Sequence, residues 1–144
     1  MSDLEQKIVA AGADKAPRLT PDYIKSMIKS EFFFTAEEGV QGHQFQTMYA
    51  DEVHGSGLES MGLLTVCVLV LENGFTIVGH SACASPENFN FEIGCDVARE
   101  NAIEQIWLLE GYRLKQRLFE EAQTKAALAE FAENNKCEGG GCTI

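Results

Sequence analysis

The clearest hydrophobic pattern in the chain lies between residues 63 and 82, and it predicts a β-hairpin. Leu63–Leu71 is an almost uninterrupted run of apolar residues, which is typical of a central strand covered on both faces. Asn73-Gly74 follows it and favours a two-residue turn, because both residues tolerate a positive φ. Phe75–Ala82 then returns as the antiparallel partner strand.

From Phe91 onward the apolar period changes to that of a helix. One stripe of small and apolar residues follows this spacing: Phe91, Cys95, Ala98, Ala102, Ile106 and Leu109. A second helical stretch is expected from about Glu110 to Phe131, with Gly111 as a bend between the two.

The N-terminal part predicts one further helix and a long loop. Thr20 is a good N-cap with Pro21 at the first helical position, and the helix is expected to end near Glu31. The aromatic run Phe32–Phe34 should then dock against the core. Residues 35–60 resemble a loop, interrupted by a strand at Gln44–Ala50.

These elements predict an α+β protein: an N-terminal helix, a small antiparallel sheet centred on the hairpin, and a long C-terminal helix or helix pair. Residues 1–17 are expected to form a flexible arm, residues 18–131 a single domain, and residues 132–144 a flexible Gly- and Cys-containing tail. A small sheet with an all-apolar strand needs further cover, so we expect a homo-oligomer, a dimer or larger.

Charge and composition exclude several classes of function. The chain has 22 acidic and 11 basic residues, a net charge of −11, so coating of DNA or RNA is not expected. No apolar run has the length of a membrane span, and the N-terminus lacks the basic region of a signal peptide. We therefore expect an intracellular protein without a membrane partner, with its five cysteines reduced.

Three stretches resemble, in order, a family of small tailed-phage and prophage proteins. They are APRLTPDYIKSMIKSEFFFTAEEGV, LTVCVLVLENGFTIVGHSACASPENFNFEIG and ARENAIEQIWLLEGYRLKQRL, which together cover about residues 16–118. The family is labelled by gene product forty-nine of phage N-four and gene sixty-six of a Shigella phage. The chain departs from the family pattern at Leu108, where a proline is expected, and at Cys95, where a basic residue is expected.

The chain is also similar in size and layout to phage anti-defence sponges of the Thoeris-inhibitor type. That resemblance implies a non-enzymatic protein of the host cytoplasm that sequesters immune nucleotide signals, such as cyclic oligonucleotides or cyclised ADP-ribose. Two alternatives stay open. One is an acidic protein-interaction module that inhibits a host enzyme, and the other is a minor phage structural or assembly protein.

The stretch GHSACASPENFNFEIG carries the main candidate ligand site. Ser85 with Pro86 is a good start for a helix, and capping alone would explain both. Asn88 and Phe89 are less easily explained by capping. A helix N-terminus binds phosphate, Asn88 could read a base or ribose edge, and Phe89 or Phe75 could stack on a base. This combination predicts a nucleotide pocket.

Arg113 and Arg117 form a second candidate, because residues four apart share one face of a helix. Guanidinium groups bind phosphate through two parallel hydrogen bonds. The alternative is a solvated face whose charge is balanced by Glu110, Glu120 and Glu121.

The sequence gives no positive indication of catalysis, of a cofactor or of a metal. Cys67, Cys83 and Cys95 occupy apolar positions and are interpreted as buried small hydrophobes. Cys137 and Cys142 lack a second pair of zinc ligands, and His43 and His54 lie in the predicted loop without a nucleophile motif.

Overall fold

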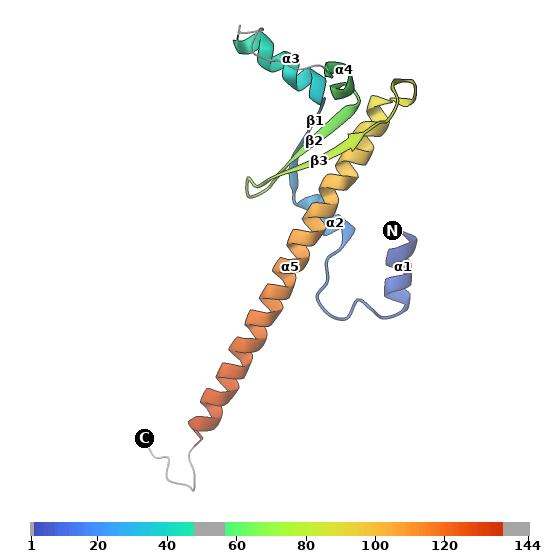
Figure 1. Ribbon diagram of the computed structural model, residues 1–144. Coiled ribbons are helices and arrows are strands. Elements are labelled where there is room, and N and C mark those ends of the chain that lie inside the picture. The colour runs from blue at the N-terminus through green and yellow to red at the C-terminus, as the bar shows by residue number, and fades with distance from the viewer. Residues whose placement is uncertain (1, 48–56, 137–144) are drawn as a thin grey trace. The chain divides into compact units, whose positions relative to one another are not determined.

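A three-stranded antiparallel sheet and the start of one long helix make up the centre of the fold (Figure 1). The computed structural model describes residues 2–47 and 57–136. The chain divides into two compact units, Leu19–Leu109 and a second that combines Met1–Arg18 with Glu110–Ile144. The α+β class predicted from the sequence is confirmed.

The predicted hairpin is present, and its first strand is central. The sheet order is β1-β2-β3, with β1 at Ile28–Thr35, β2 at Leu64–Leu71 and β3 at Thr76–Ala82. Its turn differs from the expected two-residue form. The Gly74 N–H donates to the Leu71 carbonyl (2.9 Å) and the Leu71 N–H to the Phe75 carbonyl (2.8 Å), so the loop has three residues. Gly74 adopts the left-handed region, at φ 86°.

Residues on β2 alternate between two faces of the sheet. Thr65, Cys67, Leu69 and Leu71 are buried, whereas the residues between them are only half-buried. The strand is therefore central but not covered equally on both faces.

The buried face packs against the first part of α5, a helix that runs from Phe91 to Asn134. The core consists of apolar residues from α2, the two hairpin strands and α5: Ile24, Cys67, Leu69, Leu71, Ile77, Ala98, Ala102 and Ile106. The Asn101 and Gln105 amides of α5 donate to the His80 carbonyl (2.8 Å) and the Val78 carbonyl (2.7 Å) of β3. These bonds fasten the helix to the edge strand.

Gly79 sets how close the helix can come to the sheet. A Cβ at this position would lie 2.2 Å from the Ala98 carbonyl oxygen and 2.5 Å from the Ala102 nitrogen, both backbone atoms of α5. Backbone atoms cannot move aside as a flexible side chain can, so only glycine fits.

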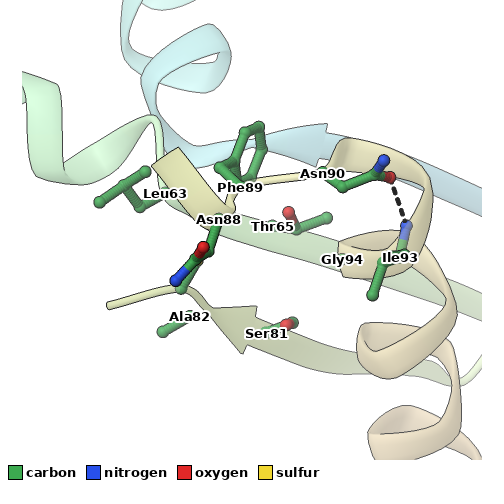
Figure 2. Close-up of a pocket in the computed structure, with 10 residues that line it drawn as sticks. Leu63, Thr65, Ser81, Ala82, Asn88, Phe89, Asn90, Ile93 and Gly94 are labelled. Carbon is green, nitrogen blue, oxygen red and sulfur yellow. Dashed lines mark hydrogen bonds between the residues drawn. The ribbon is translucent and has the colours of Figure 1, made fainter. Parts of the chain in front are cut away.

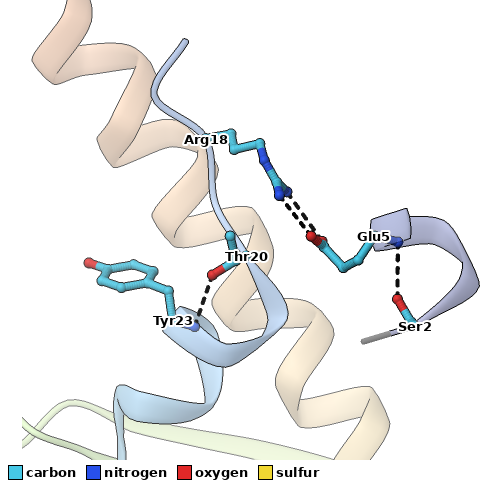
Figure 3. Close-up of polar contacts among 5 residues, drawn as sticks. All are labelled: Ser2, Glu5, Arg18, Thr20 and Tyr23. Atoms are coloured by element: carbon cyan, nitrogen blue, oxygen red, sulfur yellow. Dashed lines mark hydrogen bonds and ion pairs between the residues drawn. The ribbon is translucent and has the colours of Figure 1, made fainter. Parts of the chain in front are cut away.

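The first predicted helix begins as expected but ends early. The Thr20 hydroxyl accepts from the Tyr23 N–H (3.2 Å), and α2 spans Pro21–Ser26 (Figure 3). The prediction that this helix continues to Glu31 is wrong, because Ile28–Thr35 pairs with β2 as β1. Aromatic residues favour a strand, and Phe33 packs against the core, whereas Phe32 on the other face is exposed.

The region predicted as a loop with a strand begins as a helix. Helix α3 spans Ala36–Thr47, so a strand from Gln44 is wrong, while residues 48–50 lie outside the described residues. The Thr35 hydroxyl accepts from the Glu38 N–H (3.2 Å), the arrangement of a Thr-x-x-Glu capping box. The glycines at positions 39 and 42 disfavour a helix, so the sequence pattern indicated a loop. A short helix, α4, follows at Leu58–Met61.

In the other unit, α1 spans Asp3–Ala10 and its N-terminus is capped by the Ser2 hydroxyl, which accepts from the Glu5 N–H (3.3 Å). Arg18 holds Glu5 through two hydrogen bonds, of 2.7 and 3.2 Å (Figure 3). These bonds lower the pKa of the Glu5 carboxyl from its ordinary value.

The residues 137–144 of the predicted tail, with Cys137 and Cys142, lie outside the described residues.

The helix is not interrupted at Gly111, where a bend between two helical stretches was predicted. α5 is one helix of 44 residues, and Gly111 lies inside it without a positive φ. A helix interior tolerates an isolated glycine at a cost of about 1 kcal/mol relative to alanine, so glycine alone does not end a helix.

Two glycine substitutions of opposite sign test this packing. Gly79→Ala should lower the free energy of unfolding by roughly 1–3 kcal/mol or more, because its Cβ overlaps the backbone of α5. Gly111→Ala should raise it by about 0.5–1 kcal/mol, because a Cβ there meets nothing within 4 Å and alanine favours a helix. Urea unfolding measures both. A stable Gly79→Ala variant would contradict the close contact, and a destabilised Gly111→Ala variant would contradict the unbroken helix.

Candidate functional site

A pocket of about 180 Å³ lies where the far end of the hairpin meets the first turn of α5 (Figure 2). Its walls come from the start of β2, the end of β3, the connection that follows β3, and α5. The lining residues are Leu63, Thr65, Ser81, Ala82, Cys83, Asn88, Phe89, Asn90, Ile93 and Gly94. All of them belong to the same unit.

The connection from β3 to α5 is a short turn held by backbone bonds. Pro86–Asn88 forms a single 3₁₀ turn, η1, in which the Asn88 N–H donates to the Ser85 carbonyl (3.1 Å). The Cys83 thiol donates to the same carbonyl (3.2 Å). Ser85 is the N-cap residue of η1, with Pro86 after it as predicted, but the Ser85 side chain makes no capping hydrogen bond.

Asn90 is the residue that caps α5. Its side-chain oxygen accepts from the Ile93 N–H (3.0 Å), and its carbonyl accepts from the Gly94 N–H (2.9 Å) (Figure 2). The Asn88 side chain, which takes no part in this cap, is exposed at the pocket.

Thr65 has an unpartnered hydroxyl at the base of this pocket. The residue is 0 % exposed, and its Oγ1 has no hydrogen-bond partner among the described residues. In Figure 2 this oxygen lies on the side of Thr65 that faces Phe89. A buried hydroxyl without a partner lowers the stability of the fold by about 1–3 kcal/mol. A threonine is therefore unfavourable at position 65 if its role is purely structural.

Thr65 is the middle of a row of three hydroxyl residues across the sheet. It pairs with Thr35 on β1 and with Ser81 on β3. Thr35 uses its hydroxyl to cap α3, and Ser81 lines the pocket beside Thr65. Gly94 lets α5 approach this row, because a Cβ there would lie 2.5 Å from Thr65 Oγ1.

The structure brings together two of the residues predicted for the site. Asn88 and Phe89 line the pocket, with Ser85 adjacent in the chain but not in the lining. Phe75 lies beside the turn of the hairpin, whereas the pocket lies at its open end, where Leu64 pairs with Ala82. Seven residues of strand separate the two ends by roughly 20 Å, so Phe75 does not stack on a group held in this pocket.

Arg113 and Arg117 belong to the other unit and both have acidic neighbours on their own helix. Arg113 lies 3.3 Å from Glu110, and Arg117 lies 3.9 Å from Glu121. The exposed Arg117–Glu121 pair fits the alternative interpretation of a solvated face, since i,i+4 pairs are common on helices. The partner of Arg113 differs, because Glu110 is buried.

The sequence analysis missed Thr65, Ser81 and Gly94 as lining residues. The available signals were weak: a lone hydroxyl in the apolar run of β2, and a glycine in the first turn of a helix. Neither reveals that the two residues meet, because they are 29 positions apart in the numbering.

The described cysteines and acidic residues do not form a metal centre. Within residues 2–47 and 57–136, no group of three or more His, Cys, Asp or Glu side chains is placed to hold a metal ion. Cys67 is buried as predicted, whereas Cys83 and Cys95 are only half-buried. Burial raises the pKa of the Cys67 thiol to about 11. His54 lies outside the described residues.

The comparisons with known proteins assign the chain to a family. Residues 19–118 match the sequence profile of the phage protein (N4 Gp49/phage Sf6 gene 66) family. The chain belongs to this phage family, as its motifs predicted. No curated protein and no solved structure matches it. None of the described helices is long and apolar enough to cross a membrane.

Thiol labelling tests the burial around the site. At pH 8, Cys67 should react with iodoacetamide on the order of a hundredfold more slowly than an ordinary thiol, because its pKa of about 11 leaves little thiolate. Cys83 at the pocket should react first among the described cysteines. Mass spectrometry of tryptic peptides separates the sites. Equal rates at Cys67 and Cys83 in the folded protein would contradict the packing of α5 on β2.

Proposed function

We propose that this phage protein binds a small nucleotide signal made by the host and holds it without cleaving it. The observation that carries the proposal is the pocket at the start of α5, whose lining combines an exposed amide, an aromatic ring and a buried hydroxyl without a partner. Cyclic oligonucleotides and cyclised ADP-ribose are the ligand classes proposed. A protein of this kind would lower the free concentration of the signal and so blunt host defence.

The chemistry of the lining supports binding of a nucleotide. The Asn88 amide offers both a donor and an acceptor, which is what the edge of a base or a ribose requires. Phe89 is half-buried at the same turn and offers an aromatic surface to a base. Neither side chain is used in a hydrogen bond or ring contact within the described part of the chain, so both are available to a ligand.

The size of the pocket limits how much of a nucleotide one chain can enclose. Its 180 Å³ is below the roughly 300 Å³ at which pockets for whole small molecules begin. A base or a ribose fits, but a complete cyclic dinucleotide does not. The rest of the ligand would lie outside the pocket, in solvent or against another chain.

We also propose that the chain self-associates through the open face of its sheet. Phe32, Val68 and Val78 form one row across the three strands on that face. Phe32 is 56 % and Val78 is 53 % exposed. Adjacent exposed apolar side chains of this kind mark surfaces that associate.

The alternatives derived from the sequence make different predictions. An acidic module that inhibits a host enzyme, or a structural protein of the phage, would use its surface and would not need a small ligand. Direct binding measurements therefore separate these classes.

Asn88→Ala should weaken nucleotide binding by about 1–2 kcal/mol, or roughly 5- to 30-fold, while the melting temperature stays nearly unchanged, because the amide makes no bond within the described fold. Calorimetry against cyclic dinucleotides, cyclic trinucleotides and cyclised ADP-ribose measures this.

Asn101→Ala is the matched control for this experiment. It removes the amide that donates to the His80 carbonyl, so it should cost about 1 kcal/mol of stability and leave the affinity unchanged. If no ligand of the panel binds the folded wild type at high micromolar concentration, the proposed function is wrong.

Light scattering tests the self-association. The wild type should have a mass that is a multiple of 15.8 kDa, and Val78→Lys should reduce it, because a charge would be buried in the apolar row. Leu4→Lys is the control, since Leu4 is 66 % exposed on α1 and outside this face. A wild-type mass of 15.8 kDa at micromolar concentration would contradict the proposal.

A further inference from the structure

We infer that the pocket binds an uncharged part of its ligand, a ribose hydroxyl or the edge of a base, and that the Thr65 hydroxyl is the group that recognises it. This inference deepens the proposed function and rests on it. It assigns to the pocket the neutral portion of the nucleotide and leaves the phosphate outside.

The unpartnered hydroxyl of Thr65 indicates a ligand group that forms a hydrogen bond with it. Thr65 is fully buried, and its Oγ1 lacks a partner among the described residues. A sheet position packed against a helix could be filled by valine, which has the same shape and carries no polar atom. A group from outside the chain that forms a hydrogen bond with Oγ1 would remove the energetic cost of burying it.

The charge of the lining residues disfavours a phosphate in the pocket. None of the ten lining residues is Lys, Arg or His. Glu87 and Glu92 flank the lining residues in sequence, and Glu92 occupies the first turn of α5. The N-terminal end of a helix attracts anions, but here the Glu92 carboxylate already lies in that turn, and the Asn90 side chain accepts from the Ile93 N–H. A phosphate would gain little binding free energy in such a site.

The hydrogen-bonding groups of the lining match a neutral ligand group. Thr65, Ser81 and Asn88 each carry both a donor and an acceptor. The phosphodiester groups of a cyclic nucleotide offer acceptors only, whereas a ribose hydroxyl or a base edge offers both kinds. The volume of 180 Å³ corresponds to about six water molecules, which suits a fragment of that size.

Thr65→Val and Thr65→Ser form the matched pair that tests the inference. Calorimetry is performed on both variants and the wild type with adenosine, guanosine, their 5′-monophosphates, inorganic phosphate and a cyclic dinucleotide. Thr65→Val should bind the nucleosides and nucleotides about tenfold more weakly, whereas Thr65→Ser, which keeps the hydroxyl, should stay within about threefold of the wild type. Inorganic phosphate should not bind at the pocket, and raising the salt concentration should not change nucleoside affinity.

The melting temperature supplies the second readout. Thr65→Val should melt at the wild-type temperature or higher, because it removes a buried polar atom that lacks a partner. A merely structural threonine would give the opposite result: a lower melting temperature with unchanged affinity. Should Thr65→Val fold poorly, Ser81→Ala in the same row provides a milder variant, expected to weaken nucleoside binding severalfold.

The failures of the two proposals can be told apart. If the cyclic dinucleotide binds the wild type and Thr65→Val equally well, the proposed function stands and the inference about Thr65 is wrong. An ordered water that forms a hydrogen bond with the Thr65 hydroxyl would give this result. If nucleosides bind through Thr65 but no cyclic nucleotide does, the neutral subsite stands and the sponge function is wrong. If phosphate alone binds, or no probe binds, the inference is overturned.

Discussion

The close approach of α5 to the sheet is the constraint on which the rest of the Leu19–Leu109 unit depends. The contact is made through residues with almost no side chain: Gly79 lies against the backbone at Ala98 and Ala102, and Gly94 lies against Thr65. A helix this close to a sheet leaves no room for side chains between them, so most of the buried contact is made by backbone and methyl groups. The larger core residues, Ile24, Leu69 and Ile106, pack around this contact.

The candidate site is a direct consequence of the same contact. Because Gly94 admits Thr65 Oγ1 to the first turn of α5, the hydroxyl is removed from solvent at the point where the helix begins. The short turn Pro86–Asn88 then reverses the chain above it and presents Asn88 and Phe89 at the pocket. The position of the pocket therefore follows from the packing, whereas its polarity follows from the choice of Thr65, Ser81 and Asn88.

Local signals allowed much of this fold to be predicted. The hairpin, the start of α2 at Thr20-Pro21 and the helix after Phe91 rest on short-range patterns, and the structure has all three. In the predicted stripe of α5 the central residues are buried, whereas Phe91 and Leu109 at its ends are exposed. The errors occurred where pairing across the chain decides the outcome. Phe32–Phe34 looks like the end of a helix until it is paired with β2, and the capping box at Thr35 was obscured by nearby glycines. Thr65 could not be recognised, because its lack of a partner is a property of the packed structure.

The central claim is that the pocket holds a nucleotide and does not convert it. Mass spectrometry of small molecules released by heat tests this most directly, with protein purified from a bacterium that makes cyclic nucleotide signals. The account predicts one intact nucleotide, near stoichiometric with the binding sites. Recovery of a hydrolysed product would indicate an enzyme, and the absence of any nucleotide from well-folded protein would contradict the account.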